Sequence, residues 1–157
     1  MPPSPEDAAT AYHEAGHAVV ALALGQPVHR VSVRPKEQWL GRCEFQKGRI
    51  RSAHDPVETQ ILIMLGGLAA EARHTGHYAL DGAARDLWAV RSLTERRAAG
   101  AKQVDRLERR MLDKTEHLLD QPGMWEAVES IAEELLCRTE ISGRAARHLF
   151  DQAVRRV

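Results

Sequence analysis

Apolar residues recur at helical spacing through most of the chain and alternate with polar residues in only two short segments. The first helical segment, residues 5–24, begins after Ser4, a residue type that caps helices, and is followed by Gly25. Its second half is apolar on nearly all sides, so we expect this helix to be buried. Further helices are expected over residues 55–74, 83–98, 101–119, 122–138 and from 142 to the C-terminus.

The two alternating segments, residues 28–34 and 39–46, are expected to form strands directly after the first helix. Gly66 and Gly67 stand in the middle of the second predicted helix, at a cost of about 1 kcal/mol each relative to alanine. Such a pair indicates a close contact with another helix. We therefore predict a mainly α-helical single domain over residues 1–157, with a small β-sheet, about residues 28–46, beside the first helix.

The amino-acid composition limits the kinds of partner that we expect for this protein. The chain has 22 Lys and Arg against 22 Asp and Glu, so nothing indicates the basic surface that nucleic-acid binding needs. No apolar run approaches the roughly 20 residues of a membrane-spanning helix. The first residues lack the basic and apolar parts of a secretory signal. We expect a cytoplasmic protein with no membrane segment and no nucleic-acid partner.

One short pattern carries most of the chemical information. His13, Glu14 and His17 form the motif HExxH within the first predicted helix. Residues four apart share one face of a helix, so both imidazoles can reach a single Zn²⁺, and the Glu14 carboxylate can act as general base on a water at that metal. Because polar groups in a buried helix need partners, a metal ion also explains their presence there. The motif therefore predicts a zinc peptidase with Zn²⁺ as its cofactor.

A catalytic zinc site takes three protein ligands and leaves one position for water. The third ligand must come from beyond the motif. By residue type the candidates are Glu71, His74, His77, Asp81 and Asp86. Position in the sequence does not decide among them.

Several segments, in a fixed order, resemble the peptidase domain of the FtsH-type ATP-dependent zinc metalloproteases. Residues 11–20 (AYHEAGHAVV) are similar to the zinc helix of that family, and residues 28–35 (VHRVSVRP) to the strand that follows it. The resemblance continues in residues 61–71 (ILIMLGGLAAE), 82–87 (GAARDL) and 133–143 (EELLCRTEISG). Because these segments span nearly the whole chain, the ordered set is more specific than the motif HExxH alone.

The resemblance implies that Asp86 is the third zinc ligand, since the family's ligand is the aspartate of an Asn-Asp pair that matches residues 85–86. It also implies a mainly α-helical peptidase domain, with an edge strand that holds unfolded substrate by β-addition. That strand would be residues 28–34 or 39–46. Leu68 and Arg85 replace an arginine and an asparagine of the family. Asp81 replaces a threonine, so that Asp81 and Glu71 are candidates to support the metal from outside the ligand set.

The sequence contains no phosphate-binding GxxxxGKS/T loop, so the ATPase part of the family is not in it. We expect either a stand-alone relative or a piece of a longer protein, and the Met1 start with its proline-rich leader favours the former. The resemblance implies an unfolded protein or flexible peptide as substrate. A separate ATPase partner and a homo-oligomer are compatible with it, because family members work as hexamers.

Three interpretations of the function stay open. The favoured one is a zinc endopeptidase with Glu14 as general base. The second is an HExxH peptidase of another class with Glu71 as third ligand. The third is a non-catalytic metal-binding interaction module, against which Glu14 argues because a binding role needs no general base. Candidates for oxyanion stabilisation, by residue type alone, are His54, His74, His77 and Tyr78.

Overall fold

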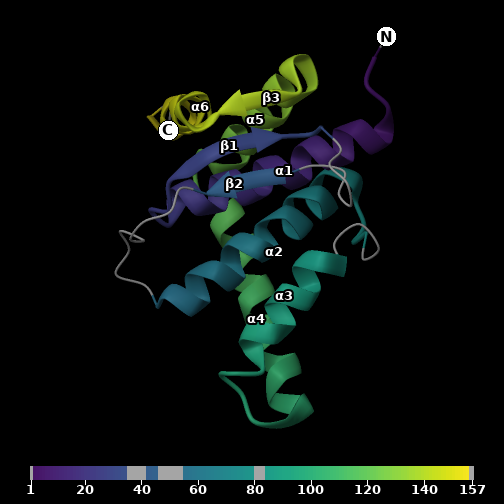
Figure 1. Cartoon of the computed structure of the whole chain (residues 1–157), viewed down its shortest axis with the longest axis vertical. Coiled ribbons are helices and arrows are strands. Elements are labelled where there is room, and N and C mark those ends of the chain that lie inside the picture. Colours follow the sequence, from purple (N-terminus) through teal and green to yellow (C-terminus); the bar gives the residue numbers. More distant parts are fainter. Residues whose placement is uncertain (1, 35–41, 46–54, 80–83, 156–157) are drawn as a thin grey trace.

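Helices dominate the chain, as the sequence predicts (Figure 1). The computed structural model describes residues 2–34, 42–45, 55–79 and 84–155, with the backbone alone for residues 42–45. Within these ranges the elements in chain order are α1 (Pro5–Ala23), β1 (Val28–Ser32), β2 (Arg42–Phe45), α2 (Pro56–Thr75), α3 (Ala84–Thr94), α4 (Gly100–Leu119), α5 (Met124–Arg138), β3 (Glu140–Ser142) and α6 (Gly143–Arg155). None of the described helices is long and apolar enough to cross a membrane.

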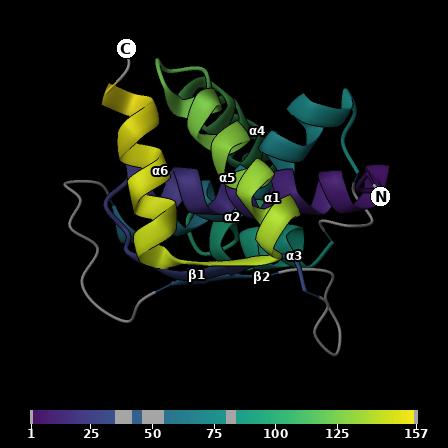
Figure 2. The same ribbon diagram turned by 90° about the horizontal axis from the view of Figure 1, so that it is seen from above.

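The first helix is the centre of the fold. Its start is fixed by a capping box: the Ser4 hydroxyl accepts the Asp7 N–H at 3.1 Å, and the Asp7 carboxylate accepts the Ser4 N–H at 3.2 Å. From Ala11 onwards α1 is buried on nearly all sides, and it packs against α2, α5 and β1. Figure 2 shows the strands along one side of α1, with α5 crossing α1 in this view.

The predicted close helix contact lies between α1 and α2. A Cβ atom added to Gly66 would lie 2.9 Å from the carbonyl oxygen of Gly16 and 2.8 Å from a methyl carbon of Val20. Neither Gly16 nor Gly66 has room for a larger residue, so the backbones of the two helices can meet at these two residues, which we call the glycine seam. The glycines in α2 therefore set how closely it approaches the helix that carries the histidines.

Three short strands form one antiparallel sheet in the order β2-β1-β3. In the centre of the sheet Val31 of β1 is opposite Cys43 of β2 and Ile141 of β3. The two predicted strands are thus present, although the first ends at Ser32, and residues 39–41 and 46 of the second lie outside the described residues. The strand β3, which has three residues and follows the left-handed Thr139 (φ 65°), was not predicted from the sequence.

Two predicted helix boundaries were wrong. The third helix ends at Thr94 rather than at residue 98, because the chain tightens into i→i+3 bonds from Arg96 N–H to the Leu93 carbonyl and from Arg97 N–H to the Thr94 carbonyl. The fifth helix begins at Met124 rather than at residue 122, because Gly123 before it is left-handed (φ 83°). Ser142 does cap the last helix, since its hydroxyl accepts the N–H of Ala145 at 3.1 Å.

Candidate metal centre

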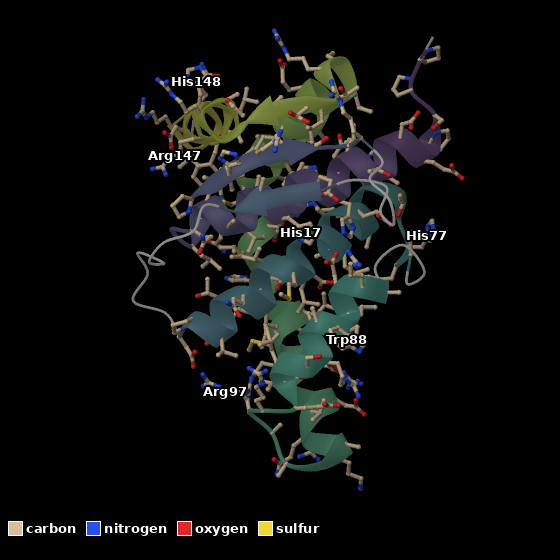
Figure 3. All side chains as sticks on the ribbon, in the orientation of Figure 1. His17, His77, Trp88, Arg97, Arg147 and His148 are labelled. Carbon is tan, nitrogen blue, oxygen red and sulfur yellow. The ribbon has the colours of Figure 1, made fainter. Side chains whose placement is uncertain are left out.

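Three side chains from two helices converge in the interior of the fold. His13 and His17 lie one turn apart on the buried face of α1, and Asp86 reaches them from the first turn of α3. The two Nε2 atoms are 3.1 Å apart, and Oδ2 of Asp86 lies 2.9 Å from that of His13 and 3.1 Å from that of His17. These three atoms form a nearly equilateral triangle, which we call the ligand triangle. Figure 3 shows His17 within the fold, beside α2.

The ring of His17 is held in one orientation by the backbone of α2. Its Nδ1 lies 2.7 Å from the carbonyl oxygen of Ile63. A carbonyl can only accept a hydrogen bond, so Nδ1 must be the donor. In the neutral ring the lone pair is then on Nε2, the atom that faces His13 and Asp86.

Glu14 brings a second buried carboxylate to the histidines. Its side chain is 6% exposed, and a carboxylate oxygen lies within 4.8 Å of one ring nitrogen of each histidine. Its Oε2 makes no hydrogen bond within the described part of the chain. A buried carboxylate oxygen without a partner is costly, which indicates that the site is shaped for chemistry rather than for stability.

Proton affinities in the cluster follow from burial and from the neighbouring charges. Burial lowers the pKa of His13, but the hydrogen bond to Asp86 and the contact with Glu71 outweigh it and raise that pKa to about 10. For His17 burial acts in the same direction, and the bond to Asp86 again raises the pKa. Burial opposes ionisation of Asp86, yet the two imidazoles hold its pKa well below the usual range. Burial raises the pKa of Glu14, which the histidine charges offset only in part.

The donor set fits a divalent metal ion. Two imidazoles and a carboxylate are ligands that zinc accepts, and tetrahedral ligands at about 2.1 Å from a zinc ion lie about 3.4 Å from one another. The sides of the ligand triangle, 2.9 to 3.1 Å, are close to that separation. Moreover, Glu14, Glu71 and Asp86 place three carboxylates around two imidazoles, so added positive charge would balance the cluster.

Glu71 lies on the opposite edge of the His13 ring from Asp86. Its Oε1 is 3.3 Å from Nδ1 of His13, whereas Oδ2 of Asp86 is 2.9 Å from Nε2. The two nitrogens of the His13 ring point in different directions. Glu71 and Asp86, which lie at different ring nitrogens, therefore cannot both bind the metal ion that His13 would share with His17. Glu71, which is 8% exposed, therefore occupies the position of a group that orients a ligand histidine.

The other candidates by residue type are not part of the ligand triangle. The ring of His74 stacks on that of Tyr12, the hydroxyl of Tyr78 donates a hydrogen bond to Glu116, and the His77 side chain is exposed. Two further candidates, Asp81 and His54, lie outside the described residues.

The comparison with known proteins decides the family. The profile of peptidase family M41 matches residues 3–100, a stretch that contains the three residues of the ligand triangle and Glu14. The chain belongs to this family. The M41 match also includes Gly66, Gly67 and Glu71.

Relatives of this M41 chain carry the name ATP-dependent zinc metalloprotease FtsH. The protein of Acidimicrobium ferrooxidans is 31% identical over 153 residues, which are 94% of this chain and 21% of the relative. FtsH 4 of Sorangium cellulosum is 33% identical over 96 residues (58% and 15%), and the protein of Magnetococcus marinus is 46% identical over 66 residues (40% and 10%). The chain thus spans about a fifth or less of the length of these relatives.

Two structural features of this M41 site were missed by sequence reasoning. The Ile63 carbonyl that orients His17 is a backbone group in an unremarkable apolar run. Tyr12 stacks on His74, and the available signal was its place directly before His13. Ile63 and His74, the α2 partners of these two contacts, lie on a helix for which the motif itself gives no information.

Proposed function

We propose that this chain is a zinc-dependent endopeptidase of the FtsH type, acting on unfolded or flexible protein segments. One observation carries the proposal: His13, His17 and Asp86 converge within 3.1 Å of one another, next to the buried carboxylate of Glu14. Membership of peptidase family M41 and the names of the relatives supply the reaction class and the metal.

The roles of the side chains follow from their positions. His13, His17 and Asp86 would hold the zinc ion, which, when bound, lowers the pKa of a water and polarises the peptide carbonyl. As the water oxygen bonds to the carbonyl carbon, Glu14 accepts one of its protons. It passes that proton to the amide nitrogen as the C–N bond breaks. Burial raises the pKa of Glu14, which favours a carboxyl group that can carry the proton between these two steps.

The described sheet has two edge strands, β2 and β3, and β2 is the one on the α2 side (Figure 1). β1 is hydrogen-bonded to β2 on one side and to β3 on the other, so it has no free edge in the described sheet. β2 has a neighbour on one side only within the described residues. Figure 1 shows β2 on the side of β1 that faces α2, the helix bordering the ligand triangle. Of the two expected segments, we therefore assign substrate pairing to β2.

The competing interpretations have less support. A site with Glu71 as third ligand would need Glu71 near Nε2 of both histidines, and it lies instead at Nδ1 of His13. A non-catalytic metal-binding module has no use for Glu14, a carboxylate held buried beside the histidines. A separate ATPase partner belongs to the proposal because the relatives are named ATP-dependent proteases. Assembly into a homo-oligomer stays a prediction.

The test is cleavage of a permanently unfolded protein by the zinc-loaded chain without nucleotide. Wild type is compared with Glu14→Gln at equal zinc content, and with Glu126→Gln as a control that removes the same charge at an exposed position on α5. We expect cleavage by wild type and by the control and none by Glu14→Gln. Absence of cleavage by all three with zinc bound, and still none after addition of an FtsH-type ATPase ring, would contradict the proposal.

A further inference from the structure

A cluster of side chains joins three helices beside the metal centre. The ring of Tyr12 on α1 lies flat against the imidazole of His74 on α2, with the ring centroids 3.8 Å apart and the planes 9° from parallel. The ring centroid of Trp125, in the first turn of α5, lies 5.7 Å from that of Tyr12. The guanidinium of Arg73 lies 4.5 Å from the Trp125 ring centroid. We call these four residues the ring cluster.

The ring cluster is directly connected to a ligand histidine through both helices. On α1, Tyr12 immediately precedes His13. On α2, His74 follows Glu71 by three residues, so the two side chains share a face of the helix. The Tyr12–His74 stack and the 3.3 Å contact between His13 and Glu71 are therefore neighbouring contacts between the same two helices. A shift or rotation of one helix changes both contacts together.

The contact between His13 and Glu71 depends on how α1 packs against α2. Although Oε1 of Glu71 is 3.3 Å from Nδ1 of His13, this ring nitrogen makes no hydrogen bond of normal geometry within the described residues. The adjoining glycine seam brings the backbones of α1 and α2 together, with Val20 and Ala70 packed against its glycines. The flat stack of Tyr12 on His74 adds a contact of defined geometry between the same two helices, because stacked rings favour particular offsets and tilts.

We infer that Tyr12 and His74 are positioning residues for the metal centre. Their stack fixes α1 against α2, holds Glu71 at Nδ1 of His13, and so directs Nε2 of His13 toward the other two ligand atoms. This inference rests on the proposed function, since it concerns how tightly the same site holds its zinc ion. Neither residue touches the metal or the substrate in this account.

The size of the effect is bounded. Loss of a group that orients a ligand histidine weakens metal binding by about tenfold to a hundredfold. An aromatic stack is worth a factor of about two to ten in an equilibrium. Because the stack acts through Glu71, removing it cannot cost more than the stack itself contributes. We therefore expect His74→Ala to raise the zinc Kd by about twofold to tenfold, less than Glu71→Gln does.

The experiment measures the zinc Kd by competition with a chelating indicator, at a temperature well below unfolding of every variant. His74→Ala is compared with His74→Phe, which keeps a flat ring for the stack, and with Trp88→Ala as a control. Trp88 is 73% exposed and lies on α3, a helix that contributes no residue to the ring cluster. We expect weaker binding in His74→Ala and wild-type Kd in the other two. Equal Kd in all three would overturn the inference.

A double-mutant cycle separates positioning from a merely structural role. If His74 acts through Glu71, adding His74→Ala to Glu71→Gln leaves the Kd of the single Glu71→Gln variant unchanged. If the two losses multiply, the inference is wrong, and His74 affects the site only through general stability. Failure of the wild type to bind zinc at all would instead overturn the proposed function, and this inference with it.

Discussion

Gly67 lies against the ring edge of His17: a Cβ atom added to it would be 2.5 Å from Nε2 of His17 and 2.7 Å from Nε2 of His13. A methyl group there would occupy the side of the two rings where the ligand atoms converge. Only side-chain ends are this close, so the rings can move apart and the helix can persist. We expect Gly67→Ala to keep its helical circular dichroism and to lose zinc affinity by about tenfold or more.

Gly76 offers a matched control on the same helix. It is the left-handed cap at the end of α2 (φ 90°), and nothing lies within 4 Å of an added Cβ. An alanine there costs about 1–2 kcal/mol of backbone strain and touches no ligand. Gly76→Ala should melt at a lower temperature and bind zinc as the wild type does. Wild-type zinc affinity in Gly67→Ala would show that the space beside the rings does not matter.

A larger residue in the glycine seam should lower the stability of the fold rather than change the chemistry of the metal centre. A Cβ atom on Gly16 would lie 2.2 Å from the carbonyl oxygen of Gly66 and 2.5 Å from Cβ of Ala70. A backbone carbonyl in mid-helix cannot move aside without separating α1 from α2. We expect Gly16→Ala to lower the free energy of unfolding by about 1–3 kcal/mol or more, measured by urea denaturation of the metal-free protein. An unchanged urea midpoint would contradict the close helix contact.

Removal of Asp86 and removal of Glu71 should affect zinc binding in different ways. Asp86→Ala deletes a ligand, so zinc should leave during dialysis against a weak chelator. Glu71→Gln keeps all three ligand atoms and should retain zinc with an affinity lower by about tenfold to a hundredfold. Zinc content measured after dialysis distinguishes the two. Full retention by Asp86→Ala, with loss in Glu71→Gln, would reverse the assignment of the third ligand.

Zinc binding should weaken as the pH falls. Asp86 and Glu71 raise the pKa of His13 to about 10 in the metal-free protein, so its ring carries an extra proton at neutral pH that zinc must displace. Below that pKa the proton competes with zinc for the ring. Each unit decrease in pH therefore raises the apparent zinc Kd about tenfold for each proton that zinc displaces. Competition titrations from about pH 8 to about pH 6 measure the slope. A flat profile would mean that zinc displaces no proton.

Sequence reasoning reached furthest where local rules decide. The Ser4 capping box, the helix of HExxH and the contact marked by Gly66 all depend on residues close in the chain or on the absence of a side chain. Asp86 could be assigned only through resemblance, because nothing in its own segment distinguishes it from four other candidate ligands. Its approach to α1 is a property of how α3 packs.

Other features were beyond local rules for the same reason. β3 has three residues and exists because β1 offers an edge to it, so its own sequence carries little strand signal. Beyond the end of the third helix at Thr94, Arg97 pairs with Asp55, 42 residues earlier in the chain. Each is set by a partner distant in sequence, which a pattern within one segment does not reveal.

The most direct test of the metal centre is a crystal structure of the zinc-loaded protein with diffraction recorded on both sides of the zinc absorption edge. We predict one anomalous peak in the domain, about 2.0–2.2 Å from Nε2 of His13, Nε2 of His17 and Oδ2 of Asp86. A peak bonded to Glu71 in place of Asp86, or a zinc ion bound elsewhere with these three side chains still hydrogen-bonded to one another, would contradict the account.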